Sequence, residues 1–154
     1  MSKKNIISII DHYIFSNMNT YGILLLRYSV GILFVWFGIL KPFGISPAQE
    51  LVANTVYWFD NKMGFVKFLG WWEVVIGLTM CYKPLIKILL VLLFIQMPGT
   101  FLPLVLLPEV CFTNFPIGLT LEGQYILKNL IIISSALVIG GRFSKQNLSK
   151  ISYS

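Results

Sequence analysis

Charged residues are scarce in this sequence. Only 12% of its 154 residues are charged, 56% are hydrophobic, and the mean hydropathy is +0.79. Soluble domains carry about 25% charged residues, so a soluble chain of this composition would expose large apolar patches. The scarcity of charge therefore argues against an ordinary soluble domain. It predicts a membrane protein of one domain, a bundle of a few membrane helices.

Metal-ligating and nucleophilic side chains are also few. The chain has one histidine, His12, and two cysteines, Cys81 and Cys111. Zinc, bis-histidine haem and di-iron sites need more ligands than these. There is no C-x-x-C, glycine-rich nucleotide loop, serine elbow or pair of catalytic carboxylates. We therefore expect no intrinsic metal or cofactor, and we favour a protein that is not itself an enzyme. The apolar run at about 85–107 separates the two cysteines by roughly the thickness of a membrane, which predicts that they form no disulfide with each other.

The positive net charge does not indicate nucleic acid. The formal charge is +6, but the basic residues stand mostly beside apolar runs. Lysine and arginine in such positions anchor and orient membrane helices at anionic lipid. The expected partner is therefore the lipid bilayer, and no nucleic acid.

Four apolar runs are long enough to cross a bilayer, which takes about 20 residues. They cover about 21–40, 65–82, 85–107 and 123–140. The sequence thus predicts an all-α transmembrane four-helix bundle over residues 21–141. Residues 1–20 have the pattern of a short interfacial helix, and residues 142–154 that of a polar tail.

The segment between the first two runs also predicts a helix. Ser46 suits the N-cap, Pro47 the first helical position and Gln49 the third. Apolar and aromatic residues follow up to Phe59. We expect an amphipathic helix on the outer membrane surface.

Basic residues are distributed unevenly between the two sides of the predicted bundle. One side collects Lys3, Lys4, Lys83, Lys87, Arg142, Lys145 and Lys150, and the other holds Lys41, Lys62 and Lys67. The positive-inside rule therefore places both termini in the cytoplasm.

Three charges interrupt the apolar runs: Arg27, Glu73 and Lys128. Each costs about 2.5–3.5 kcal/mol at a helix centre on insertion scales, so such residues usually face the bundle interior and pair. Glu73 lies between the other two in depth and could pair with either. The three either clamp the bundle or form a polar site for a ligand or a proton relay. Further candidate residues of this polar core are Gln96, Thr100 and Gln124, and candidates on the outer face are Lys41, Glu109 and Glu122.

Aromatic residues offer a second kind of site. Trp36 and Trp72 stand in the first two runs. They are either lipid-facing and packing residues or the walls of a flat apolar slot. Such a slot would suit a quinone-like ring or a lipid, which are the candidate ligands.

The order of these features resembles the DoxX-like membrane proteins, and particularly their YkgB-type branch of prokaryotic inner-membrane proteins. The resemblance covers most of residues 22–141. Its most distinctive stretch is Glu122-Gly123-Gln124-Tyr125 followed by Lys128-Asn129-Leu130; weaker matches are Leu26-Arg27, Phe34 to Lys41, Trp72-Glu73 with Gly77, and Thr100 to Leu102 with Leu107 to Glu109. In this family a lysine follows the first span and a basic residue lies in the fourth, which Lys41 and Lys128 match. Pro42-Phe43-Gly44 replaces an aromatic-acidic pair of that branch.

The resemblance implies a four-helix bundle in a bacterial inner membrane. Our first hypothesis is a non-catalytic or ligand-binding protein that helps the envelope to resist oxidants or other stress through its polar core. The second is an accessory subunit of a quinone-linked oxidoreductase, with a membrane redox partner. The third is a small-solute transporter or channel, which would require a homo-oligomer because four spans are too few for most pores.

Overall fold

The computed structural model describes residues 3–151, with the side chains of Met18 and of residues 21–144. The helices are α1 (Lys3–Leu40), α2 (Gln49–Thr55), α3 (Lys62–Cys81), the 3-10 turn η1 (Lys83–Leu85), α4 (Ile86–Leu106), α5 (Pro108–Cys111), α6 (Leu121–Leu127) and α7 (Asn129–Ile151). Two short strands, β1 (Phe112–Asn114) and β2 (Gly118–Leu119), pair antiparallel between α5 and α6. The predicted all-α fold class is confirmed.

Within residues 3–151, four segments are long and apolar enough to cross a membrane. They are Tyr21–Leu40, Lys62–Cys81, Lys83–Leu106 and Leu121–Ser144. The fourth consists of two helices, because α6 ends at Leu127 and α7 begins at Asn129. The chain is therefore a multi-pass membrane protein, with span boundaries close to those that hydropathy predicts.

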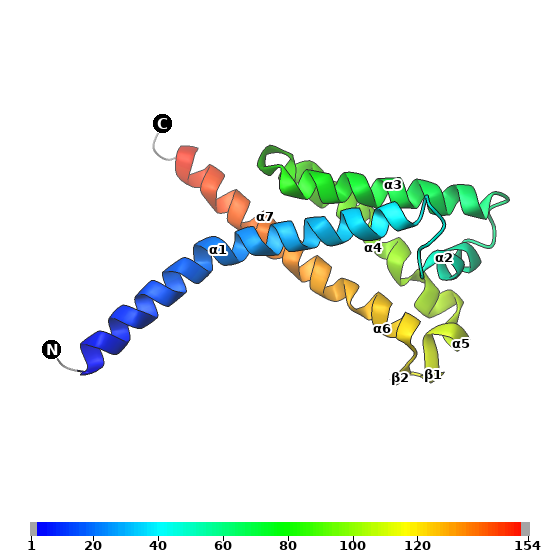
Figure 1. Ribbon diagram of the computed structural model, residues 1–154, viewed down its shortest axis with the longest axis horizontal. Helices are drawn as coiled ribbons and strands as arrows, with labels where there is room; N and C mark the ends of the chain where they lie inside the picture. The colour runs from blue at the N-terminus through cyan, green and yellow to red at the C-terminus, as the bar shows by residue number, and fades with distance from the viewer. Residues whose placement is uncertain (1–2, 152–154) are drawn as a thin grey trace.

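The bundle has two distinct ends (Figure 1). The first residues of α1 and the last residues of α7 lie at one end, which we call the terminal end. The helix α2 and the β1–β2 hairpin lie at the opposite end, which we call the loop end. Because α3 runs from the loop end to Cys81 at the terminal end, depth in the bundle can be followed along its sequence.

Local structure differs from the sequence prediction at three places. Residues 3–20 continue into the first span as one helix, α1, rather than forming a separate helix; their predicted interfacial face lies outside the described side chains, as does His12. The helix α2 begins at Gln49, because Ser46 to Gln49 form a turn closed by a 3.1 Å bond from the Gln49 amide to the Ser46 carbonyl. The predicted polar tail is helical as far as Ile151.

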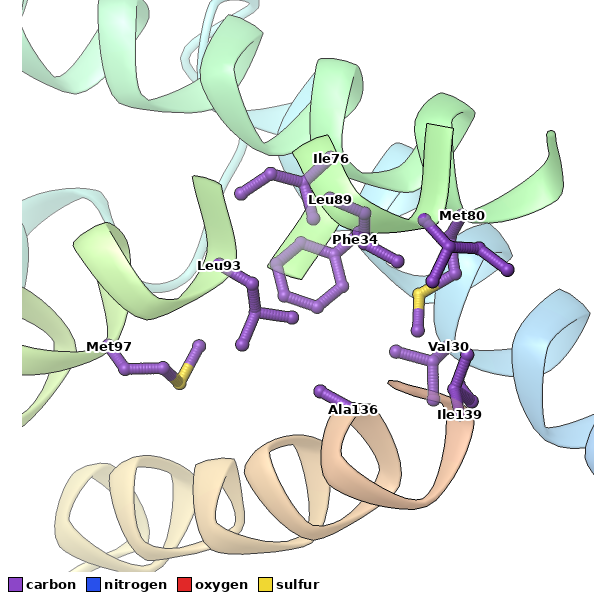
Figure 2. Packing of buried hydrophobic residues seen from close by; sticks show 10 residues of the cluster. Val30, Phe34, Ile76, Met80, Leu89, Leu93, Met97, Ala136 and Ile139 are labelled. Carbon is purple, nitrogen blue, oxygen red and sulfur yellow. The ribbon is translucent and has the colours of Figure 1, made fainter. Parts of the chain in front are cut away.

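Apolar side chains from α1, α3, α4 and α7 form one core (Figure 2). Its members are Val30, Phe34, Ile76, Met80, Ile86, Leu89, Leu93, Met97, Ala136 and Ile139. In lipid this packing cannot rely on the hydrophobic effect, since the acyl chains are as apolar as the side chains. Close packing and polar contacts between helices must therefore supply much of the stability.

Glycines bring α1 and α3 into close contact at two levels. A Cβ on Gly77 would lie 2.6 Å from the Gly31 carbonyl oxygen, and one on Gly70 would lie 2.6 Å from that of Gly38. The glycines are seven residues apart on each helix, which is two turns, so both pairs lie along one seam of the antiparallel helices. Only small residues permit this backbone approach in membrane helix pairs.

Candidate functional site

Lys41 lies just past the end of α1, where the glycine seam reaches the loop end. The helix α1 ends at Leu40, since Pro42 has no amide hydrogen with which to continue it. Gly44 then adopts a positive φ of 74°, and the Ile45 amide bonds back to the Leu40 carbonyl at 3.1 Å. This turn holds Lys41 against α3, where the residue is only 4% exposed.

The Lys41 ammonium forms an ion pair with Glu73 of α3. Glu73 lies about 16 Å along α3 from Lys62, near the middle of a hydrocarbon core about 30 Å thick. Its side chain is 12% exposed, and Gly38 of α1 lies directly against its Cβ position. Side chains of a helix lean toward its N-terminus, so the carboxylate leans toward the loop end and Lys41. The ion pair therefore connects α1 to α3 beside the Gly38–Gly70 contact.

Gln96 of α4 completes the arrangement. Its Nε2 donates to Glu73 Oε1 at 3.0 Å, and the residue is 7% exposed. A carboxylate only accepts hydrogen bonds, which fixes the amide nitrogen toward Glu73. Gln96 Oε1 is consequently buried, and it has no hydrogen-bond partner in the part of the chain that the structure describes. We call Lys41, Glu73 and Gln96 the polar cluster.

Tyr125 of α6 brings the fourth span into the electrostatic surroundings of the polar cluster. Its phenol lies within electrostatic reach of Glu73. Its ring meets Phe37 of α1 edge to face, with the ring centres 6.3 Å apart. The Phe37–Tyr125 ring pair thus connects α1 to α6, and through Tyr125 the fourth span lies near the polar cluster.

Arg27 does not belong to the polar cluster. Its Nε and Nη2 donate to the Met80 carbonyl at 3.2 and 2.9 Å, and Nη2 also donates to the Cys81 carbonyl at 3.3 Å. These are carbonyls of the last turn of α3, which lack helical partners and attract cations. Glu73 therefore does not pair with Arg27, one of the two partners that the sequence allowed, because Glu73 lies two turns away along α3 and pairs with Lys41.

Lys128 is the second expected partner that the structure separates from Glu73. It lies at the junction of α6 and α7, exposed on the bundle surface, and the described part of the chain gives it no ion pair or hydrogen bond from its side chain. Its Cβ leans toward the helix start at the loop end, which allows the ammonium to extend toward that membrane surface. The predicted Arg27–Glu73–Lys128 core is thus replaced by Lys41, Glu73 and Gln96.

The other candidate polar residues are satisfied locally. The Thr100 hydroxyl donates to the Met97 carbonyl at 2.8 Å, within its own helix. The Gln124 side chain is exposed, and its Nε2 donates to the Leu119 carbonyl at 3.5 Å. Among the described hydrogen bonds, neither side chain bonds to the polar cluster. Groups of three or more residues able to hold a metal ion are absent from the described residues.

The two tryptophans lie on different surfaces. Trp72 is partly buried against the core, with its ring centre 6.0 Å from that of Phe68. Trp36 is 65% exposed and lines an apolar groove of about 330 Å³, together with Gly31, Ile32, Val35, Ile39 and Cys81. Trp36 follows the buried Phe34 by two residues, which is about 200° around the helix, so Trp36 faces away from the core that Trp72 packs against. The two indoles therefore do not form one slot.

Cys111, Glu109 and Glu122 lie at the loop end. Cys111 is fully buried, and its thiol donates to the Pro103 carbonyl at 3.4 Å. Burial raises the pKa of the Cys111 thiol, and the negative charges of Glu122 and Glu109 raise it further. Cys81 lies at the terminal end, and both cysteines are free thiols.

The residue that sequence reasoning misplaced is Lys41. Hydropathy puts it outside the first span, and the seam that carries it to Glu73 depends on glycines 31, 38, 70 and 77. Their repeat of seven residues on both helices was the available signal. Comparisons of the chain with protein-family models, with curated proteins and with solved structures found no match.

Proposed function

We propose that this membrane protein is a non-catalytic ligand-binding protein whose site is the polar cluster. The observation that supports the proposal is the Gln96 carbonyl oxygen, which is buried beside Glu73 and receives no hydrogen bond from the described residues. A buried acceptor without a partner costs about 1–3 kcal/mol, and in a membrane no bulk water can relieve it. A bound donor would remove that cost.

The cluster's charge defines the class of ligand. Lys41 and Glu73 neutralise each other. A charged ligand would add an uncompensated charge at mid-depth, which is costly. The ligand that fits is a neutral molecule dissolved in the membrane, with a hydroxyl that donates to Gln96 Oε1.

Decanol and decyl methyl ether provide a test, because the two probes differ in the single O–H donor. Each is added to the purified protein in nanodiscs, and thermal unfolding is followed by the reaction of Cys111 with a thiol dye. Decanol raises the unfolding midpoint of the wild type more than the ether does, since a ligand that binds the folded state stabilises it. Gln96→Leu removes the difference, and the control Gln124→Leu keeps it. Equal effects of both probes on the wild type would refute the proposal.

The cellular role that we propose follows the resemblance to DoxX-like proteins. The protein would lie in a bacterial inner membrane, with both termini in the cytoplasm, and would help the envelope to resist oxidants. A deletion strain should then be sensitive to an oxidant. Wild type should restore growth, whereas Glu73→Gln should not. If Glu73→Gln also restored growth, the polar cluster would not be needed for resistance to the oxidant, and the proposed role of the cluster would be refuted.

The orientation has its own test. In a background without Cys81 and Cys111, a cysteine is introduced at Ile117, which is 87% exposed in the hairpin, or at the exposed Lys83 of the terminal end. An impermeant thiol reagent on intact cells should label position 117 and leave position 83 unlabelled. The opposite pattern would reverse the orientation.

Two observations support alternative functions. The apolar groove beside Trp36 favours an accessory subunit of a quinone-linked oxidoreductase; a purified complex that binds no quinone would exclude it. The exposed Lys128 within the fourth span favours an oligomer in which another subunit supplies an anion, as in a transporter or channel. Solute flux in proteoliposomes that Glu73→Gln abolishes would support that function.

A further inference from the structure

The groove beside Trp36 and the Arg27 side chain belong to one continuous surface. Cys81 of α3 lines the groove, and the Cys81 carbonyl accepts a hydrogen bond from Arg27 Nη2 at 3.3 Å. Gly31 lines the same groove and follows Arg27 by four residues, one turn along α1. The guanidinium therefore lies at the end of the groove nearest the terminal end of the bundle.

The guanidinium has N–H donors to spare, and the described residues give it no anionic partner. Arginine has five N–H donors. The contacts of Arg27 use Nε and Nη2 on two carbonyls, while no contact of Nη1 is found among the described residues. No carboxylate among them pairs with Arg27 either. A permanent positive charge at the edge of a spanning segment thus lacks a counter-charge from the described chain, and its two Nη1 donors suit a phosphate.

The position of Arg27 agrees with the level of lipid phosphates. Arg27 lies about 9 Å along α1 from Tyr21, and its side chain leans toward the helix start. Its acceptors are the final carbonyls of α3, which ends at Cys81. The guanidinium consequently lies at the membrane boundary of the terminal end, whereas the groove extends from it toward mid-depth.

The groove itself suits an acyl chain. Its lining residues Ile32, Val35 and Ile39 are apolar, and together with Gly31 they follow one face of α1. Tyr28 precedes Ile32 by four residues and is 43% exposed, so this face continues past the groove to a hydroxyl-bearing ring. A polar end and an apolar trough in this order match a phospholipid.

We propose that Arg27 and the groove beside Trp36 form a binding site for one anionic phospholipid, with its phosphate on the Arg27 guanidinium and an acyl chain along α1. The site is separate from the polar cluster. Basic pockets between membrane helices are a known way to bind anionic head groups. Lipid bound here would complete the contact of α1 with the last turn of α3.

Native mass spectrometry of the purified protein tests this proposal with two probes, phosphatidylglycerol and phosphatidylcholine of the same acyl chains. The wild type should retain one phosphatidylglycerol more tightly than phosphatidylcholine. Arg27→Gln should weaken the binding of phosphatidylglycerol by about fivefold, the effect of about 1 kcal/mol for one basic residue near the membrane surface. The control Lys87→Gln removes an exposed charge at the same end and should leave that binding unchanged.

A second variant keeps the test decisive if Arg27→Gln fails to fold. Ile32 is 57% exposed in the groove, so Ile32→Trp fills the groove without entering the core. It should also reduce the retention of phosphatidylglycerol. Equal retention of the two lipids by the wild type would overturn the proposal, as would unchanged retention by Ile32→Trp. An equal loss in Lys87→Gln and Arg27→Gln would show general surface attraction instead.

Discussion

Removal of Glu73 alone should destabilise the protein severely. Lys41 is 4% exposed, and the Glu73 side chain is 12% exposed, so each charge depends on the other. Glu73→Leu leaves a buried ammonium unpaired, which costs about 3–5 kcal/mol. The free energy of unfolding of a folded protein is typically about 5–15 kcal/mol, so this cost is a large part of it. Lys41→Met should cost a similar amount, because it leaves the carboxylate unpaired.

The double variant separates the charge pair from mere packing. Lys41→Met with Glu73→Leu removes both charges, but it leaves the Gln96 side-chain amide without its acceptor. The double variant should therefore lose about 1–3 kcal/mol of unfolding free energy. Addition of Gln96→Leu should recover most of that loss. The assay is the free energy of unfolding in mixed micelles titrated with SDS, with Cys111 exposure as the readout and exposed Lys128→Met as the control. Costs that simply add in the double variant, or single variants within about 0.5 kcal/mol of the wild type, would refute this reasoning.

Two further predictions concern packing and the buried thiol. Gly70→Ala should destabilise by about 1–3 kcal/mol, because its Cβ would lie 2.6 Å from the Gly38 carbonyl oxygen. Gly22→Ala, with nothing within 4 Å, should be neutral or stabilising in the same SDS titration; equal costs would contradict the glycine seam. Alkylation of Cys111 in the folded protein should be slow at pH 8, because burial and the charges of Glu122 and Glu109 raise its pKa and lower the thiolate fraction. Glu122→Gln should lower that pKa and speed alkylation modestly, since burial remains the larger cause; rapid alkylation of the wild type at pH 8 would oppose this account of Cys111.

Hydropathy was sufficient to predict the four spans, because span length and composition follow directly from the thickness of the bilayer. It also predicted that Glu73 would be paired inside the bundle. It could not choose the partner. Arg27 and Lys128 both stand within apolar runs, whereas Lys41 follows one and appears exposed in a hydropathy profile. The choice depends on how closely α1 approaches α3, and the glycines at 38 and 70 determine that distance.

The ends of the bundle were less predictable than its spans. The β1–β2 hairpin and the turn before α2 depend on backbone hydrogen bonds over a few residues, such as that from the Thr120 amide to the Cys111 carbonyl at 3.0 Å. Such bonds leave no periodic signal in the sequence. The role of Arg27 at the end of α3 was missed for a related reason, since its acceptors are backbone carbonyls that any residue provides.

A density map of the purified protein in lipid nanodiscs would test the polar cluster most directly. If the polar cluster binds a hydroxyl-bearing ligand, the map should show a feature larger than one water molecule within about 3 Å of Gln96 Oε1, the distance of a hydrogen bond. The Lys41–Glu73 pair should be intact beside it. A single water molecule at that oxygen, or a side chain of the protein donating to it, would contradict the proposal that the cluster binds a hydroxyl-bearing ligand.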